Sequence, residues 1–277
     1  EYRKDGLDML CVSGEVLWIG RKRDDEKEGR IALFLAEAKE LYAPLTRTSA
    51  PTAQPELLEL LRRKGASYVS ALSRESGLAP SELQQRLLDL VWEGRVSNDQ
   101  FAPVRTLLAS KGGGRGRTQP SVKNGFGRWY VVDSLCDAPI EPERSAMQWM
   151  RQLLDTNGIV TKDTVEEQSP YSWDTMQGML RKLEEWGAAV RGLYIRDVQR
   201  LQYASKRFLD EWADNAVPPS AGSGDEIVVL AAVDPANPFG VTVDWPAAMS
   251  ANGEQPARKP GNYFILRGGT PLMWLEH

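Results

Sequence analysis

The sequence contains few of the residues that build metal sites and disulfide frameworks. In 277 residues it has 2 cysteines, Cys11 and Cys136, and 1 histidine, His277. The cysteines are far apart and show no CxxC spacing, which fits a protein of the reducing cytoplasm. With a single histidine they do not supply the four ligands of a structural zinc site, so no metal site is predicted. The terminal Leu-Glu-His resembles the remainder of a purification tag, and we read the chain as a fragment of a longer protein.

Long apolar runs and an excess of positive charge are also absent. No stretch comes near the roughly 20 consecutive apolar residues of a membrane span, and there is no signal peptide. The formal net charge of −4 argues against a protein that coats nucleic acid by its overall charge. The apolar share of 42% is high enough for folded cores. Binding to nucleic acid therefore has to come from a local basic surface.

Motifs for nucleotide hydrolysis are missing as well. The glycine-rich string GGGRGRT lacks the lysine of GxxxxGK[ST], and it does not stand between a buried strand and a helix. We therefore expect no motor activity, no catalytic residue and no cofactor in this chain.

What is present is one strongly basic window between Asp99 and Asp133, which contains no acidic residue. Positive side chains on a glycine-rich loop can follow a phosphate backbone, and each neutralised phosphate releases counterions. The sequence therefore predicts a nucleic-acid contact here; the alternative is a solvated loop without a partner. The six positive residues of the window are Arg105, Lys111, Arg115, Arg117, Lys123 and Arg128.

An internal repeat organises the middle of the chain. Gly65 and Gly158 lie 93 residues apart, and so do Leu87 and Leu180. Matching apolar positions in phase indicate that the two segments pack in the same way. Each copy has the pattern of a helix, a short helix, a longer helix and a strand, which is typical of the winged-helix form of the helix-turn-helix. The fold class predicted is α+β, with tandem winged-helix modules followed by a small C-terminal β-domain.

The basic window lies between the strands RVSN and GRWYVV of the first module, so we interpret it as a long wing. We expect Trp129 to pack in the core. In the second module we predict a strand over AAVRGLYI and a helix over VQRLQYASKRFLDEW. Arginine and tyrosine side chains suit phosphate and sugar contacts, and amides can add hydrogen bonds. The candidates in the second module are Arg191, Tyr194, Arg196 and Gln202.

The longer helices, 80–93 and 172–186, carry several carboxylates, which would repel phosphates. We therefore predict that they pack against neighbouring modules and do not read bases. Trp186 is expected in a core or a module interface. Asp234 lies in the proline-rich DPANPFG, which predicts a rigid turn. The domain boundaries expected are 1–50 for a β-hairpin and helix of a preceding module, 55–135 and 140–215 for the winged helices, and 225–277 for a C-terminal β-unit that is a candidate for truncation.

Six strings follow one another over nearly the whole chain: LDMLCVSGEVLWIG, LVWEGRVSNDQFAPVRTLL, GRWYVV, RGLYI with QYA, VLAAVDPANPFG and PGNYFILRGGTPLMWLE. In this order they resemble the bacterial large helicase-related (Lhr) proteins. This resemblance implies the C-terminal extension of an ATP-dependent DNA helicase, in which ATP and Mg belong to the motor domains. The family pattern continues with glycines after RGLYI, where this chain has RDVQRL.

The same resemblance implies DNA repair as the context, and single-stranded or structured DNA and the helicase core of the same polypeptide as partners. It implies a place in the cytoplasm with the nucleoid, and a part in oligomer formation. Because the extension is similar to a class of bacterial DNA glycosylases, a glycosylase-like repair domain is an alternative. In those relatives paired glutamines lie near a flipped base, but Gln199 and Gln202 are spaced more widely. A pure oligomerisation scaffold is the other alternative.

Overall fold

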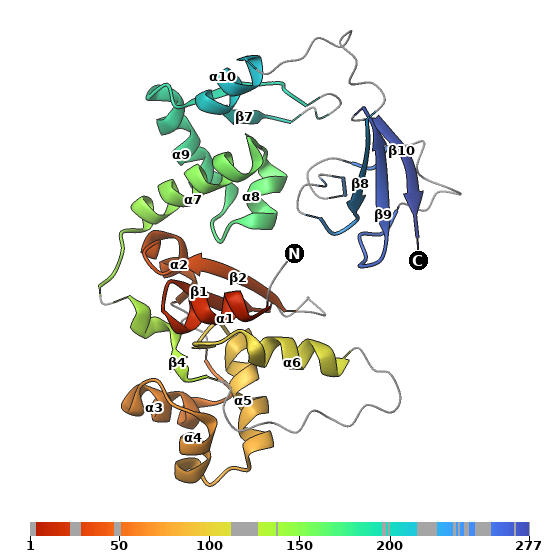
Figure 1. Cartoon of the computed structure of the whole chain (residues 1–277). Helices are drawn as coiled ribbons and strands as arrows, with labels where there is room; N and C mark the ends of the chain where they lie inside the picture. Colours follow the sequence, from red (N-terminus) through yellow and green to blue (C-terminus); the bar gives the residue numbers. More distant parts are fainter. Residues whose placement is uncertain are drawn as a thin grey trace. The chain divides into compact units, whose positions relative to one another are not determined.

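The computed structural model divides the chain into two compact units, Glu1–Ser145 and Ala146–His277, which are described one at a time. Helices and small antiparallel sheets alternate along the chain, so the predicted α+β class is confirmed (Figure 1). The structure describes residues 4–22, 29–46, 51–111, 127–136, 138–195, 198, 200–214, 226–234, 237, 239–240, 244–246, 256–268 and 270–276.

The first unit begins with a helix and a hairpin and continues into the first winged helix. Its elements are α1 (Lys4–Val12), β1 (Val16–Arg21), β2 (Arg30–Leu35), α2 (Lys39–Thr46), α3 (Pro55–Lys64), α4 (Val69–Ser76), α5 (Pro80–Trp92), β3 (Val96–Asn98), α6 (Ala102–Lys111), β4 (Trp129–Val131) and the 3-10 turn η1 (Val132–Leu135).

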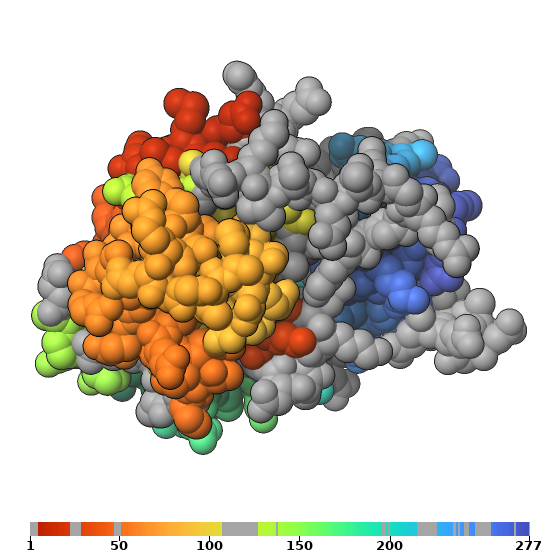
Figure 2. All heavy atoms as spheres, turned by 90° about the horizontal axis from the view of Figure 1, so that it is seen from below, coloured from red at the N-terminus to blue at the C-terminus, as the bar shows by residue number. Residues whose placement is uncertain are grey.

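Local sequence explains where the helices of the first winged helix begin and end. Pro55 and Pro80 stand in the first turns of α3 and α5, where a missing N–H costs little. Gly65 closes α3 and Gly94 follows α5, both with a positive φ of 73°, which glycine adopts without strain. In Figure 2 the residues of α3 to α5, drawn in orange, form one continuous surface. The helix-turn-helix part of the module thus follows from its local sequence.

The hairpin of the first winged helix is antiparallel, with Ser97 opposite Tyr130. An isolated bridge between Ser67 and Trp129 adds a minimal third strand. The predicted pairing on either side of the basic window is therefore confirmed. The window is not only a loop, however, because residues 102–111 form α6. Val104 of this helix is 1% exposed, so burial of its apolar side supports a helix that the sequence pattern did not predict.

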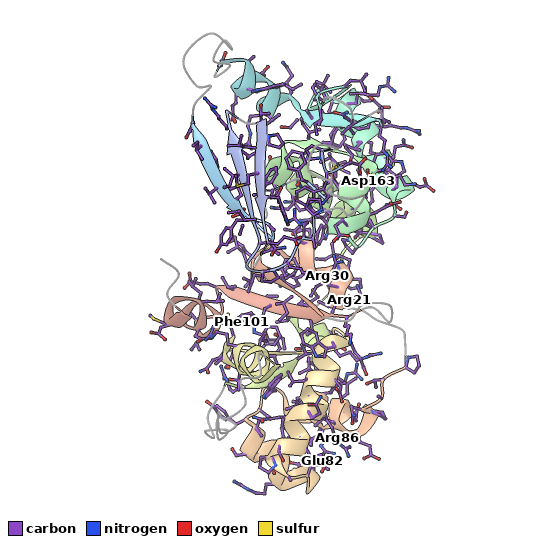
Figure 3. The ribbon with its side chains drawn as sticks, turned by 90° about the vertical axis from the view of Figure 1, so that its right-hand side faces the viewer. Arg21, Arg30, Glu82, Arg86, Phe101 and Asp163 are labelled. Atoms are coloured by element: carbon purple, nitrogen blue, oxygen red, sulfur yellow. The ribbon has the colours of Figure 1, made fainter. Side chains whose placement is uncertain are left out.

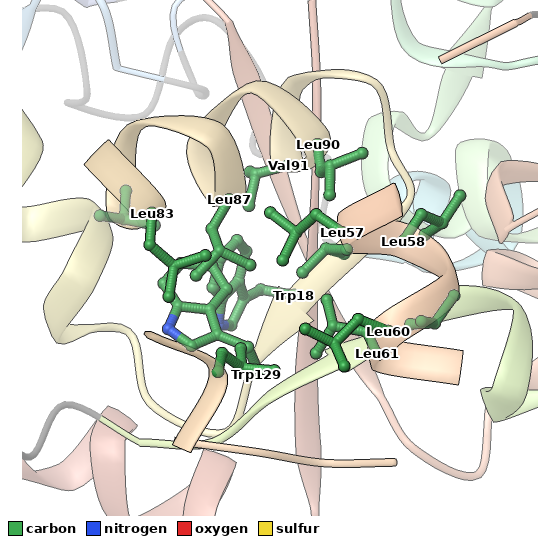
Figure 4. Packing of buried hydrophobic residues seen from close by; sticks show 14 of the residues in the cluster. Trp18, Leu57, Leu58, Leu60, Leu61, Leu83, Leu87, Leu90, Val91 and Trp129 are labelled. Carbon is green, nitrogen blue, oxygen red and sulfur yellow. The ribbon is translucent and has the colours of Figure 1, made fainter. Parts of the chain in front are cut away.

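The core of the first unit joins this winged helix to the N-terminal hairpin. Leu83, Leu87 and Leu90 of α5 are fully buried and pack with the leucines of α3 and with Trp129 (Figure 4). Trp18 of β1 lies in the same cluster and is also fully buried. The Ser97 hydroxyl donates to the Trp18 carbonyl over 2.6 Å. The hairpin at the start of the chain therefore shares a core with the residues of the first winged helix.

The second unit contains the second winged helix, whose first helix begins a few residues earlier at Pro142, and a small sheet. Its three-stranded winged-helix sheet has the order β5-β7-β6, and the C-terminal sheet has the order β10-β9-β8. The elements are α7 (Pro142–Asn157), β5 (Ile159–Val160), α8 (Lys162–Gln168), α9 (Trp173–Glu185), β6 (Ala189–Gly192), β7 (Gln202–Ser205), α10 (Lys206–Asp214), β8 (Ile227–Ala231), β9 (Tyr263–Arg267) and β10 (Thr270–Leu275).

The helix predicted over VQRLQYASKRFLDEW is wrong in its first part. Residues 202–205 form the strand β7, and the helix α10 begins only at Lys206. Tyr203 pairs with Val160 on one side and with Arg191 on the other, and it is 1% exposed. Pairing on both edges thus outweighs the helical tendency of the local sequence.

The internal repeat is confirmed at the level of packing. Gly158 and Gly187 both have φ 69° and occupy the places of Gly65 and Gly94. Met176, Leu180 and Leu183 form the buried side of α9, as the leucines do in α5. The two modules therefore solve the same packing problem with equivalent residues.

The C-terminal sheet is held by aromatic side chains on one face. Phe264 is fully buried and lies 5.7 Å from Trp245, measured between ring centroids. The predicted turn after Asp234 is confirmed by the Asn237 N–H, which donates to the Asp234 carbonyl over 3.0 Å. The Asn237 side chain donates to the Ala232 carbonyl over 3.0 Å, and the Arg258 guanidinium donates to the Asn237 carbonyl over 2.6 Å. Asp234 therefore belongs to a structural turn.

Candidate nucleic-acid interface

The first wing is rooted between β3 and β4, and Gly127 brings the chain back to the sheet. Gly127 has φ 57°, and a Cβ atom there would come within 2.1 Å of the Asn98 Oδ1 atom. Only glycine fits this close approach without a shift of the neighbouring side chain. The structure therefore describes the end of the wing, Gly127 and Arg128, directly before β4.

Arg128 is tied to the sheet by the carboxylate of Asp99. Its Nε atom lies 2.7 Å from Asp99 Oδ2, and its backbone N–H donates to Asp99 Oδ1 over 2.6 Å. These hydrogen bonds raise the pKa of the Arg128 guanidinium above its ordinary value. The side chain is still 49% exposed, so it has both a fixed position and access to solvent.

Arg105 has a structural position. Its guanidinium forms an ion pair with Asp8 of α1 and lies 5.6 Å from the centre of the Phe101 ring. Asp8 also accepts a hydrogen bond of 2.8 Å from the Phe101 N–H. The Arg105 side chain is only 22% exposed. Asp8 therefore holds the start of α6 against α1, and Arg105 is engaged inside the unit.

The other predicted contacts of the first wing are described only in part. Lys111 is the last residue of α6, and its side chain lies outside the described residues. Arg115, Arg117 and Lys123 also lie outside the described residues, as does Arg196 of the second module. Their roles stay predictions.

Gln202 in the second module is fully buried, and among the described residues its amide bonds to backbone groups. Its Oε1 atom accepts from the N–H groups of Tyr194 and Ile195, each over 2.8 Å. Its Nε2 atom donates to the carbonyls of Val198 over 2.7 Å and Ile195 over 3.3 Å. The side chain predicted to contact nucleic acid thus lies inside the module and organises the connection between β6 and β7.

Tyr194 folds back onto the strand that precedes it. Its hydroxyl donates to the Val190 carbonyl over 3.1 Å, and its ring covers Gly192, where a Cβ atom would come within 2.7 Å of the Tyr194 Cζ atom. Burial raises the pKa of the Tyr194 hydroxyl. Arg191 stays 59% exposed, with its Nε atom 3.6 Å from the Glu184 carboxylate. Of these residues, Arg191 is the one whose charged group faces solvent.

The long helices of both modules carry internally paired polar side chains. On α5 the Arg86 guanidinium lies 2.7 Å from the Glu82 carboxylate, and Figure 3 shows the two side by side. On α9 Arg181 donates to Gln177 over 3.2 Å. Trp186, expected in a core or an interface, is 61% exposed in this chain. The ion pair on α5 lowers the free positive charge that this helix offers to a phosphate.

The described residues contain no group of three or more His, Cys, Asp and Glu side chains placed to hold a metal ion. Cys11 is buried, and this burial raises the pKa of its thiol. Within the part of the chain that the structure describes, no helix is long and apolar enough to cross a membrane.

Two winged helices with paired hairpins define the class of the protein as a tandem winged-helix protein. In the comparison with known families, residues 139–222 and residues 1–36 are similar to winged-helix domains of the large helicase-related protein. The resemblance to the C-terminal region of the Lhr proteins is thereby confirmed.

Two relatives match along the chain. The Lhr helicase/uracil glycosylase of Escherichia coli is 27% identical over 306 residues, which cover 99% of this chain and 20% of that protein. The Lhr helicase/probable uracil glycosylase of Mycolicibacterium smegmatis is 30% identical over 309 residues, which cover 100% of this chain and 20% of that protein. The chain therefore spans about a fifth of the length of these relatives.

Proposed function

We propose that this chain is a nucleic-acid-binding and assembly region of an Lhr-type ATP-dependent DNA helicase that acts in DNA repair in the cytoplasm. The observation that carries the proposal is the paired hairpin β3–β4, which flanks the basic window of a winged helix. Because the window extends from a folded hairpin, its positive side chains have a fixed root from which to reach phosphates.

The binding mode that this supports is contact with the backbone of single-stranded or structured DNA. On α5 the Arg86 guanidinium is paired with the Glu82 carboxylate, which disfavours reading of base edges by this helix. Affinity should then depend on salt and little on sequence, because the release of counterions supplies most of the binding free energy. ATP and Mg serve the motor domains of the whole helicase, outside this region.

A salt titration of DNA binding tests the proposal. Arg115→Ala/Arg117→Ala should lower the affinity of the chain about tenfold and reduce the slope of log K against log salt by about 1.5 to 2, measured by fluorescence anisotropy. The matched control is Arg62→Ala/Arg63→Ala, which removes the same charge from α3, where both arginines are paired with carboxylates. Absence of binding by the unchanged chain at low salt would favour the oligomerisation scaffold.

The names of the two relatives favour a second candidate, a uracil glycosylase activity. The Gln202 amide is fully engaged with backbone groups, which leaves this side chain without a free hydrogen bond for a flipped base. Release of uracil from a uracil-containing oligonucleotide by the purified chain would support this candidate. It would leave an abasic site, at which alkali cleaves the strand, so an oligonucleotide that stays intact in alkali would oppose it.

A further inference from the structure

Gln202 holds the described part of the connection between β6 and β7 through hydrogen bonds to backbone atoms. We call its described residues, Leu193–Ile195, Val198 and Arg200–Leu201, the second wing. Gln202 binds this wing with four hydrogen bonds of 2.7 to 3.3 Å, all of them to backbone atoms. A buried amide with both of its polar atoms satisfied fixes a backbone, because any other conformation would leave those atoms without partners.

Contacts with residues outside the wing also hold it in place. The Tyr194 ring lies against Gly192, and its hydroxyl bonds to the Val190 carbonyl. Arg200, near the other end of the wing, forms an ion pair with Asp163 of α8. The wing is thus held from β7, from β6 and from a helix of the same module.

This braced wing presents apolar side chains to solvent. Leu193 is 79% exposed and Leu201 is 38% exposed. They directly follow and precede the paired residues Gly192 and Gln202, so they stand opposite each other at the base of the wing. Arg191, two residues before Leu193, has an exposed guanidinium that lies 3.6 Å from the Glu184 carboxylate, which is beyond hydrogen-bond distance.

We propose that the second wing is a preorganised contact for unpaired nucleotides, in which Leu193 packs on a base or sugar, Arg191 contacts a phosphate, and Gln202 is the positioning residue. This inference rests on the proposed function. An exposed apolar side chain beside an arginine suits a nucleotide, which offers an apolar ring face and an anionic phosphate a few ångströms apart. Two leucines are too few for a protein–protein interface of standard size, which takes about 20 to 30 residues a side.

Preorganisation explains why a fully buried glutamine stands at position 202. A flexible wing would lose conformational freedom on binding, and that loss would weaken affinity. With Gln202 in place, the wing already loses this conformational freedom when the protein folds, so the loss no longer weakens binding. Substitution of Gln202 should therefore weaken binding through the wing, without any contact between Gln202 and the nucleic acid.

The experiment is a double-mutant cycle on the 277-residue chain, with an oligothymidylate of about 20 nucleotides as the probe and anisotropy as the readout. Gln202→Met removes the hydrogen bonds at nearly constant volume, and Leu193→Ala removes the contact. Each should lower affinity about fivefold, and the double variant should bind about as Leu193→Ala does, because the two changes act on one contact. The matched control is Gln152→Met, at an exposed glutamine of α7, and it should bind as the unchanged chain does.

Hydrogen exchange supplies the readout that separates positioning from general stability. In Gln202→Met the N–H groups of Tyr194 and Ile195 should exchange at least about tenfold faster, while those of α9 keep their rates. Should Gln202→Met unfold the module, Tyr194→Phe removes only the hydroxyl bond to Val190 and enters the same cycle as a milder change.

Three results would overturn the inference. Faster exchange at Tyr194 and Ile195 with unchanged affinity would show that the wing makes no contact. Additive losses in the cycle would show that Gln202 acts elsewhere. Unchanged affinity of Leu193→Ala for the probe, together with weaker binding of another protein domain, would make the wing a protein interface. Failure of the proposed function is distinct from these results, because the unchanged chain would then not bind the probe at low salt.

Discussion

The two winged helices differ at equivalent positions in a way that separates charge from shape. In the first module Glu75 of α4 forms ion pairs with Arg63 and Lys64 at the end of α3. In the second module the residues 93 positions after Lys64 and Glu75 are Asn157 and Gln168, and their amides bond to each other over 3.1 and 3.3 Å. The same link between two helices is ionic in one module and neutral in the other.

The wings of the two modules also differ in that one anchor is ionic and the other is neutral. The first wing is a long basic insertion that contains α6, and its anchor is an ion pair between Arg105 and Asp8 outside the hairpin. The second is short, and its anchor is the neutral amide of Gln202 inside the module. The comparison teaches that two modules with the same fold can anchor their wings in different ways, by an ion pair in the first and by a neutral amide in the second. Salt should act on the first module more than on the second.

The largest effect is expected from substitutions that test whether equivalent residues of the internal repeat contribute equally to the two cores. Leu87→Ala and Leu180→Ala remove equivalent side chains that are fully buried. Each should lower the free energy of unfolding by about 3 kcal/mol through lost burial and a residual cavity. Segment-resolved hydrogen exchange should show the change in α3 to α5 for the first variant and in α7 to α9 for the second. Leu35→Ala, at a leucine that is 56% exposed, is the control. A loss confined to one of the two variants would break the comparison.

A smaller effect is expected from the anchor of the first wing. Asp8→Asn removes the charge that pairs with Arg105 and weakens the acceptor for the Phe101 N–H. Because both side chains are less than a quarter exposed, the free energy of unfolding of the first unit should fall by roughly 1 to 3 kcal/mol. Hydrogen exchange of α6 should accelerate first. Unaltered exchange of α6 would mean that α6 is held by its apolar contacts alone.

The smallest effect concerns pH. Hydrogen bonds from Lys64 and Arg63 lower the pKa of Glu75 below its ordinary value of 4.5. A lowered folded-state pKa stabilises the fold above the unfolded value, and this stabilisation is lost as pH falls through the folded value. Acidification below 4.5 should therefore weaken the α3–α4 link, while the amide pair of the second module does not titrate. Thermal unfolding of the Glu75→Gln variant should depend less on pH in this window. An unchanged pH dependence would argue against the ionic link.

Much of the helical framework could be predicted from the sequence, and parts of the site could not. The helix ends at Gly65 and Gly158 and the apolar stripe through Leu87 are local signals, and the structure has them as expected. Asp99 entered only as the boundary of the basic window, and its pairing with Arg128 was not predicted from the sequence. The hairpin geometry shows that the Asp99 carboxylate bonds to Arg128. For Gln202 there was no signal at all, since an amide in a polar string looks like a surface residue.

The amino-acid sequence alone determined the repeat, the capping glycines, the buried stripes and the place of the basic window, because each depends on neighbours within a few turns of the chain. The tertiary structure decided the features that depend on contacts between residues far apart in the sequence. Residues 202–205 became a strand because two other strands flank them, α6 became a helix because Val104 found a core, and Trp18 joined the first module through contacts with residues far away in sequence. Local propensity is weak in energy, so contacts of this kind override it where the two disagree.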